Sequence, residues 1–384
     1  MAAKRQHRNR RMEAESAGVV GLGLMGHSII ACLLAAGHTV VGLSRDLSRH
    51  RGTRRHILNL LREMKREGLL KRDPGALAGR LDLSEDFRDL AGCGIVIESI
   101  IEDLETKKQT YRQVEEIVAS HTIIGSNTSS IPVSLLQSGA LRPERFVGIH
   151  WDEPAHVTRF LEVIAGEKTA PRYAKRVMEM ARRWGKEPSL VRRDVRGFIT
   201  NRVSYAMFRE ACHLVDSGIA TVEDVDRSLR NDVGWWMTFA GPFRYMDLMG
   251  VTAYYRVMKD LLPELSTSPE IPALMRKTVE SGGKGIANGR GFYRYTPALG
   301  VAVPEVQLRH PQAGPEIPGG RGKPRPGQGK EEMTRRVKNF TDLTGRVAVV
   351  IGGTSGLGRT IAIGLAEAGA DVVATGRRAD LVEE

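Results

Sequence analysis

Short apolar runs alternate with amphipathic stretches between residues 17 and 194. The runs are GVVGLGL, HTVVGL, GIVIESI, HTIIGS, RFVGIHW and LEVIAG. Because strands that alternate with helices need crossover connections, this order predicts an α/β domain with a Rossmann-type, doubly wound, mostly parallel sheet. The segment 47–79 is longer than one crossover needs. We expect two helices there, the first strongly basic, that project from the sheet as an appendage.

The pattern changes to helical periodicity over residues 195–297. Stretches such as NRVSYAMFREACHLVDSG and TVEDVDRSLRNDVG carry apolar residues at helical spacing. We therefore predict an all-helical second domain. Residues 298–338 are rich in proline, glycine and charge, which is typical of a linker, and residues 1–16 form a basic tail.

Composition narrows the function classes. The chain of 384 residues has 57 basic and 45 acidic residues, a formal charge of +12. Much of the excess lies in the tail and in residues 321–338, without interleaved aromatic residues, so we expect anionic small molecules rather than nucleic acid as partners. No apolar run approaches the roughly 20 residues that span a bilayer, and the start lacks the apolar core of a secretory signal. Cys32, Cys93 and Cys212 are scattered without metal-ligand spacing, which indicates a reducing cytoplasm and no metal.

A glycine-rich turn between the first apolar run and a helix predicts a dinucleotide site. Gly21, Gly23 and Gly26 have the spacing G-x-G-x-x-G, with Leu24 and Met25 between the last two. The first glycine permits the tight turn, the second lets the backbone approach the pyrophosphate, and the third lets the helix pack on the strand. The amide groups at the helix start then face the phosphates. The alternative is a glycine turn that serves packing alone.

The second strand ends in LSRD, where an acid usually binds the adenosine ribose of NAD. Ser44 and Arg45 stand there instead. An acid would repel a 2′-phosphate, whereas Arg45 can bind it, so these residues favour NADP or mixed use over NAD alone. Asp46 can still reach the ribose, and NAD stays open.

Several motifs in the same order resemble the L-3-hydroxyacyl-CoA dehydrogenase family over about residues 17–297. They are IVIESIIEDLETKK, IIGSNTSSIP, RFVGIHWDEPAHVTRFLEVI, DVRGFITNRV and GPFRYMDLMG. The resemblance implies a two-domain enzyme that oxidises an L-3-hydroxyacyl-CoA to the 3-oxoacyl-CoA. It also implies NAD as the usual cofactor and dimers through the helical domain.

The resemblance implies that His150 takes the proton of the substrate hydroxyl and that Glu162 orients it. An imidazole with a pKa near neutrality suits this task, and a carboxylate between apolar neighbours needs a partner. Ser129 and Asn201 match residues that reach the substrate oxygen, Ser129 also on the nicotinamide side. Glu102 and Lys107 match residues near the cofactor. The alternatives are a structural histidine, an edge-strand carboxylate, a turn serine, a helix-capping asparagine and an exposed pair on a helix surface.

The chain also departs from the family pattern. Glu153 stands where an asparagine usually contacts the cofactor, Arg196 replaces a common proline, and Ala287 replaces a common lysine, with Lys284 nearby. On the appendage, Leu60 occupies a serine position, while the basic residues Lys65 and Arg66 lie near a lysine position that contacts CoA. A CoA thioester is therefore the expected substrate, and a small free hydroxy acid, as in the related L-gulonate dehydrogenases, is the alternative. A non-catalytic dinucleotide-binding protein is a third reading.

Residues 339–384 resemble the start of a short-chain dehydrogenase/reductase. The pattern maps to Gly352, Gly356 and Gly358, and Arg377 and Arg378 follow the second strand, where they can pair with a 2′-phosphate. The tyrosine and lysine of that family lie beyond the last residue here, and two strands with one helix bury little apolar surface. We expect a partial second Rossmann unit, apart from the main body and without activity of its own. It is either part of a longer fusion or a fragment.

Overall fold

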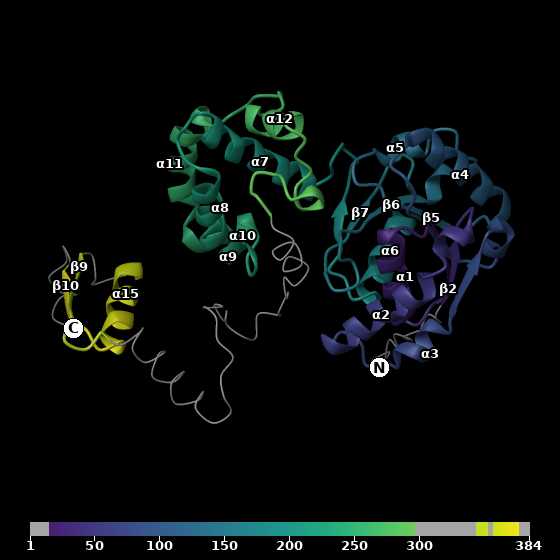
Figure 1. The fold of residues 1–384 in the computed structure, drawn as a ribbon, viewed down its shortest axis with the longest axis horizontal. Helices are drawn as coiled ribbons and strands as arrows, with labels where there is room; N and C mark the ends of the chain where they lie inside the picture. Colours follow the sequence, from purple (N-terminus) through teal and green to yellow (C-terminus); the bar gives the residue numbers. More distant parts are fainter. Residues whose placement is uncertain (1–14, 296–342, 352–355, 376–384) are drawn as a thin grey trace, which may run out of the picture. The chain divides into compact units, whose positions relative to one another are not determined.

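A computed structural model describes residues 15–295, 343–351 and 356–375. The chain divides into two compact units, residues 1–301 and 302–384. The first unit holds an N-terminal region, from β1 to β8, and a helical region, from α7 to α12 (Figure 1). Residues 1–14 of the predicted tail, the predicted linker, and Gly352, Arg377 and Arg378 lie outside the described residues.

The N-terminal region is built on an eight-stranded sheet with the strand order β3-β2-β1-β4-β5-β6-β7-β8. Only the β6–β7 pairing is antiparallel among these neighbours. The predicted mostly parallel, Rossmann-type sheet is therefore confirmed. The strands are β1 (Ser16–Val20), β2 (Thr39–Leu43), β3 (Leu81–Ser84), β4 (Ile95–Glu98), β5 (Ile123–Ser126), β6 (Phe146–His150), β7 (Glu162–Ile164) and β8 (Ser189–Val191).

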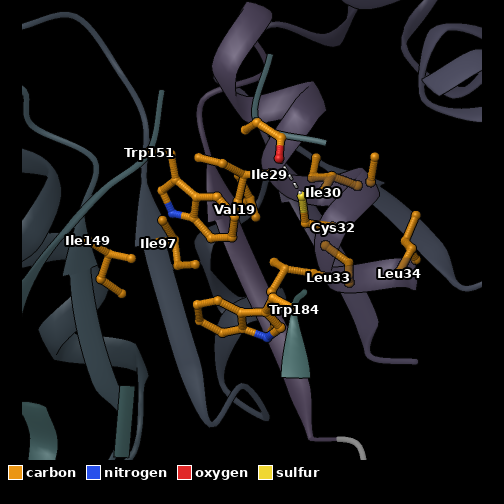
Figure 2. Close-up of a cluster of buried hydrophobic side chains, with 14 of the residues drawn as sticks. Val19, Ile29, Ile30, Cys32, Leu33, Leu34, Ile97, Ile149, Trp151 and Trp184 are labelled. Atoms are coloured by element: carbon orange, nitrogen blue, oxygen red, sulfur yellow. Dashed lines mark hydrogen bonds between the residues drawn. The ribbon is translucent and has the colours of Figure 1, made fainter. Parts of the chain in front are cut away.

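Alternate residues of the inner strands enter two separate cores, one on each face of the sheet. Val19 and Ile97 face one core, whereas Val20 and Val96 face the other. The first core includes side chains of α1 (Leu24–Ala35), α2 (Thr53–Arg66), α3 (Pro74–Ala78) and α6 (Pro171–Arg183), and the second includes those of α4 (Leu104–Ile117) and α5 (Val133–Leu136). In the first core, the rings of Trp151 and Trp184 stack with centroids 5.4 Å apart beside α1 (Figure 2). Short 3-10 helices complete the connections at Leu47–His50, Phe87–Leu90 and Pro143–Arg145.

Three local expectations need correction. The apolar runs do not predict β3 and β8, because each is a short strand at a sheet edge with only one side chain fully buried. The segment 47–79 does form two α-helices, but α2 does not project from the sheet. Its side chains Ile57 and Leu61 are fully buried in the core beside α1, so α2 belongs to the layer that covers the sheet.

The helical region follows directly after the sheet, which confirms the predicted all-helical second domain. Its α-helices are α7 (Thr200–Asp216), α8 (Val222–Asn231), α9 (Val233–Met237), α10 (Pro242–Met249), α11 (Val251–Leu261) and α12 (Ala273–Glu280), with 3-10 turns at Leu262–Glu264 and Ile286–Asn288. Helices α7, α10, α11 and α12 have no buried side chain. In the second unit, β9 (Val347–Ile351) and β10 (Asp371–Thr375) pair in parallel and are joined through α15 (Gly356–Glu367).

Candidate active site

The turn between β1 and α1 has the geometry that a dinucleotide needs. Gly21 has φ of +107°, and a Cβ there would lie 2.4 Å from the carbonyl oxygen of Ser99. A Cβ on Gly26 would lie 2.0 Å from the carbonyl oxygen of Gly21, so helix and turn are in direct contact. A Cβ on Gly23 would meet no atom within 4 Å, which leaves its backbone open to a ligand. The three glycines thus do what a pyrophosphate-binding turn requires.

A cavity of about 850 Å³ opens over this turn. Leu24 and Met25 line it at the helix start, Glu102 and Ser129 line it farther along, and the end of β2 contributes Ser44, Arg45 and Asp46. The Asp46 carboxylate accepts hydrogen bonds from the Ser48 hydroxyl and amide, at 2.5 and 3.0 Å. The hydroxyl bond lowers the pKa of Asp46. Asp46 therefore caps the next turn, while Arg45 is exposed beside the cavity.

His150 and Glu162 face each other across the antiparallel pair β6–β7. The register pairs the two residues directly, and His150 Nδ1 lies 2.9 Å from Glu162 Oε2. Because a carboxylate only accepts, Nδ1 carries the proton and Nε2 is left as the basic nitrogen. No described residue makes a hydrogen bond to Nε2. The rings of Phe160 and Phe198 flank the imidazole, with centroids 5.4 and 5.6 Å away.

The start of α7 anchors the other oxygen of Glu162. Backbone amides of Ile199 and Thr200 donate to Oε1 over 3.1 and 2.9 Å. Burial favours the neutral carboxyl, but the hydrogen bonds from His150 and these amides outweigh it and lower the pKa of Glu162. The preceding residue, Phe198, is buried with φ of +50°, a left-handed conformation that is strained for a bulky side chain. This turn aims both amides at Glu162, so the dyad depends on the junction with the helical region.

Asn201 and Ser129 meet one residue farther along α7. The Asn201 side-chain amide donates to the Ser129 carbonyl oxygen over 2.9 Å. The Ser129 amide in turn donates to Glu102 Oε1 over 2.9 Å, and Glu102 also accepts from the Ser130 amide and the Thr128 hydroxyl. Although burial opposes ionisation, the bond from Thr128 and the charge of Lys107 lower the pKa of Glu102. Glu102 thereby fixes the backbone of the loop that carries Ser129.

Lys107 is fully buried between two carboxylates, so it is not part of an exposed helix pair. Its Nζ lies 2.6 Å from Glu98 Oε1 and 3.2 Å from Glu102 Oε2. Glu98 also accepts hydrogen bonds from the Tyr111 and Ser126 hydroxyls at 2.5 and 2.8 Å. Burial and the charge of Glu98 raise the pKa of Tyr111 well above its ordinary value. This charge cluster ties α4 to the end of β4 and holds Glu102 in place.

Glu153 lies on the loop after His150, the candidate base at the end of β6, and its side chain points toward α1. Ser28 Oγ donates to Glu153 Oε1 over 3.2 Å, and the other carboxylate oxygen is buried without a hydrogen-bond partner among the described residues. Ser28 also lies 3.3 Å from His156, whose second nitrogen is 3.1 Å from Glu63 on α2. A polar chain therefore connects the loop after β6 with both helices.

The CoA-contact candidates on α2 separate into two groups. Lys65 and Arg66 are exposed in the last helical turn, where cations interact favourably with the helix end. Leu60 is only 8% exposed and packs in the core beside α1. Its side chain therefore contributes to the fold and makes no polar contact with a substrate.

Sequence reasoning missed Glu98, Asn127 and Phe198. Glu98 carries the same signal that singled out Glu162, a carboxylate inside an apolar run. Asn127 accepts a hydrogen bond from the Trp151 amide over 3.0 Å, which fixes the residue after His150. The left-handed turn at Phe198 has no signal in a single sequence, because a bulky residue rarely adopts it.

The described residues contain no helix long and apolar enough to cross a membrane. They also hold no group of three or more histidine, cysteine or carboxylate side chains that would bind a metal ion.

Comparison with known proteins matches most of this chain to one family. Residues 16–195 match the family model for the 3-hydroxyacyl-CoA dehydrogenase NAD binding domain, and residues 197–295 match the model for the C-terminal domain. A protein of Mesorhizobium japonicum named 5-formyl-3-hydroxy-2-methylpyridine 4-carboxylate 5-dehydrogenase is 33% identical, covering 76% of this chain and 94% of its own. A probable 3-hydroxybutyryl-CoA dehydrogenase of Deinococcus radiodurans is also 33% identical, with 72% and 99% covered.

Solved structures agree with these relatives. The crystal structure of a 5-formyl-3-hydroxy-2-methylpyridine 4-carboxylic acid 5-dehydrogenase, described as an NAD+ dependent dismutase, has a TM-score of 0.71 at 32% identity and covers 76% of this chain and 94% of its own. The (S)-3-hydroxybutyryl-CoA dehydrogenase of Ralstonia eutropha has a TM-score of 0.61 at 28% identity, with 74% and 99% covered.

Proposed function

Since this chain belongs to the 3-hydroxyacyl-CoA dehydrogenase family, we propose that it oxidises the hydroxyl of an L-3-hydroxyacyl-CoA reversibly to the 3-oxoacyl-CoA. It is an NAD-dependent oxidoreductase of the 3-hydroxyacyl-CoA dehydrogenase type. The observation that carries the proposal is the His150–Glu162 pair beside Asn201 and Ser129, on the sheet that also forms the dinucleotide turn.

The proposed chemistry divides between cofactor and protein. Gly21, Gly23 and Gly26 would hold the pyrophosphate of NAD, and the bound cofactor would supply the acceptor for the hydride from the carbon that bears the hydroxyl. His150 Nε2 takes the hydroxyl proton, and the ionised Glu162 stabilises the imidazolium through Nδ1. Asn201 and Ser129 orient the substrate oxygen, and donors there stabilise its developing charge. Glu102 and Lys107 act through the Ser129 loop.

We propose that Ser44 and Arg45 also admit a 2′-phosphate, because the carboxylate of Asp46 is already bonded to Ser48. Glu153 lies on the loop after His150 and is a proposed cofactor contact by that position, although its carboxylate accepts from Ser28 on α1 and its second oxygen is buried, so the contact requires the side chain to turn toward the cavity.

Spectrophotometry of NADH tests the substrate class. The full chain is assayed for NADH consumption with acetoacetyl-CoA, and for NADH formation with 3-hydroxybutyryl-CoA and with free 3-hydroxybutyrate. We expect turnover of the thioesters. A protein that binds NAD yet turns over none of these substrates would support the non-catalytic alternative.

A small free hydroxy acid is the second candidate substrate, because one CoA-contact candidate is missing. Leu60 is buried in the core and offers no polar group. The Mesorhizobium japonicum relative is also named for a pyridine carboxylate rather than a thioester. Turnover of the free acid in preference to the thioester would establish this alternative, in which Lys65 and Arg66 play no part in binding.

We propose that the protein is a homodimer assembled through the helical region. Several large apolar side chains there are exposed, for example Phe243 at 78%, Tyr255 at 70% and Trp235 at 67%. A soluble domain rarely leaves so many exposed unless another surface covers them. A second copy of the chain would cover these side chains, because it presents the same apolar face.

Two further proposals concern the ends of the chain and its environment. The parallel β9–α15–β10 unit supports the proposal that residues 339–384 are the start of a short-chain dehydrogenase/reductase domain. The three cysteines Cys32, Cys93 and Cys212 are free thiols, which suits a reducing compartment such as the cytoplasm.

A further inference from the structure

A second cavity, of about 410 Å³, lies between the start of α1 and the segment that leads into α2. It is distinct from the dinucleotide cavity, although Arg49 and His50 line both. The other lining residues are His27, Gly52, Thr53, Arg55, His56 and Asn59. None of the eight lining residues is acidic. The reaction proposed above uses none of them.

The lining of this cavity contains arginine and histidine side chains, and it contains no carboxylate that would balance their charge. Arg49 and Arg55 are permanent cations. The rings of His27 and His56 are 5.0 Å apart, and His27 Nε2 lies 3.1 Å from the Thr53 hydroxyl. Burial, together with the neighbouring His56 and His50, lowers the pKa of His27 to about 4. The surroundings of His27 therefore disfavour protonation of its imidazole.

The beginning of α2 adds to the same positive potential. Helix α2 starts at Thr53, Gly52 provides no side-chain cap, and the first turn has no acidic residue. Arg54 and Arg55 stand in that turn instead, at the helix end where cations are unfavourable. The nearest acidic residue of the preceding turn, Asp46, lies outside this lining; it is bonded to Ser48 and also interacts with Arg49, so Arg55 is the arginine of the lining that Asp46 leaves unbalanced. An anion bound in the cavity would interact favourably with the start of α2 and with the arginines beside it.

We propose that this cavity binds a phosphate group, held by Arg49 and Arg55 with the histidines as further donors. A phosphate monoester has several terminal oxygens and suits donors that converge from different sides, whereas a carboxylate offers two. The cavity is larger than a phosphate ion, so it has room for part of the group that carries the phosphate. The inference rests on the proposed function only for the position of the dinucleotide beside Arg49 and His50.

The phosphate has two possible sources. Arg49 and His50 join the cavity to the adenosine side of the dinucleotide cavity, near Ser44 and Arg45, so a 2′-phosphate of NADP is one source. A phosphate of a separate ligand, such as the 3′-phosphate of CoA, is the other. Both present the same chemistry to the cavity, and binding experiments separate them.

Inorganic phosphate is the probe for the site itself. The full chain is titrated with phosphate at constant ionic strength, with chloride as the reference, and the imidazole resonances of His27 and His56 are followed by NMR. We expect saturable shifts, and we expect Arg55→Gln to weaken phosphate binding about tenfold. Arg51→Gln is the matched control, because Arg51 is exposed in the same segment and lines neither cavity. Shifts identical to those in chloride, or an equal loss in both variants, overturn the proposal.

Affinities of intact ligands then identify the source. If Arg55→Gln weakens NADP but not NAD, the 2′-phosphate occupies the cavity. If it weakens CoA but not dephospho-CoA, the 3′-phosphate does. If it weakens inorganic phosphate alone, the site serves the free ion. These are equilibrium measurements without turnover, so their failure leaves the His150 chemistry untouched, and an inactive enzyme leaves the phosphate site open to test.

Discussion

The N-terminal region and the helical region bury their apolar side chains in opposite ways. In the N-terminal region, α1 places Ile29, Ile30 and Leu33 at 0% exposure between the sheet and α2. In the helical region, α7, α10, α11 and α12 bury no side chain, and Phe243 is 78% exposed. The first region supplies its own core, whereas the second leaves apolar faces exposed, which the proposed dimer would cover.

The two regions also contribute differently to the candidate active site. His150, Glu162 and Ser129 stand on the sheet or its loops, where buried neighbours fix them. The helical region adds the amides of Ile199 and Thr200 and the side chain of Asn201, all at the start of α7. A change in the N-terminal core is therefore expected to affect folding, and a change on the helical faces is expected to affect association.

Two tryptophans test this contrast most strongly. Trp184 is buried and stacks on Trp151, so Trp184→Ala is expected to lower the free energy of unfolding by about 3–5 kcal/mol. The same change at Trp235, which is 67% exposed, is expected to weaken the proposed dimer, so its loss in melting temperature should be larger at low than at high protein concentration. Thermal and urea unfolding at two protein concentrations measure both. Equal, concentration-independent losses would break the comparison.

Introducing a charge on the exposed apolar face of the helical region is expected to have the next largest effect. Phe243→Glu would bury an unpaired carboxylate in the proposed interface, and the dimer dissociation constant is expected to rise about 10³-fold. Leu141→Glu is the control, because Leu141 is similarly exposed, at 73%, but lies in the N-terminal region. Sedimentation velocity gives the oligomeric state. A wild-type monomer, or a control that dissociates equally, would remove the proposed role of the helical face.

Glu162→Gln tests how far the junction supports the dyad. The amide keeps the shape but loses the charge that stabilises the His150 imidazolium, so kcat is expected to fall about 10²-fold. NAD affinity, measured by fluorescence titration, is expected to stay unchanged. An activity close to wild type would mean that His150 needs no carboxylate.

The lowered pKa of Glu162 makes a separate prediction for stability. Its hydrogen bonds favour the ionised form in the folded protein. This stabilisation is present above the ordinary pKa of a glutamate and is lost as the pH falls through the lowered value in the folded state. Acidification over that range should therefore cost wild type more unfolding free energy than Glu162→Gln. Parallel curves for the two proteins, in denaturant titrations across that range, would count against the anchoring by α7.

The smallest expected effect concerns the turn after β2. Arg45→Asp places an acid beside the proposed ribose position, and the ratio of NADPH to NADH affinity is expected to fall about tenfold. Arg51→Asp adds the same charge outside the dinucleotide cavity and is expected to leave the ratio nearly unchanged. If the ratio stays the same in Arg45→Asp, Arg45 does not read the 2′-phosphate.

The sequence predicted the inner part of the N-terminal region because both faces of its strands are buried. Continuous apolar runs mark β1, β4, β5 and β6, and the glycines at 21, 23 and 26 mark the turn. The sequence did not predict the edge strands β3 and β8, because a half-exposed strand of three or four residues has no continuous run of apolar residues. The sequence did not predict that α2 packs in the core, because a basic helix with one apolar stripe has the same pattern as a helix that projects into solvent.

The candidate site was predictable only as far as local motifs reach. His150 and Glu162 stand out by their motifs, and the structure brings them within 2.9 Å. The amides that hold Glu162 come from a strained turn at Phe198, which depends on packing from distant segments. The exposed faces of α7, α10 and α11 show apolar periodicity in the sequence, yet that pattern does not tell a core from an interface.

Replacement of His150 tests the central claim most directly. NADH formation from 3-hydroxybutyryl-CoA is measured for wild type, His150→Gln and His121→Gln, with NAD affinity determined for each. His121 is exposed ahead of β5 and serves as the matched control. The account predicts that His150→Gln lowers kcat about 10³-fold with NAD affinity intact, while His121→Gln behaves as wild type. An activity of His150→Gln within about threefold of wild type would contradict the assignment of His150 as the base.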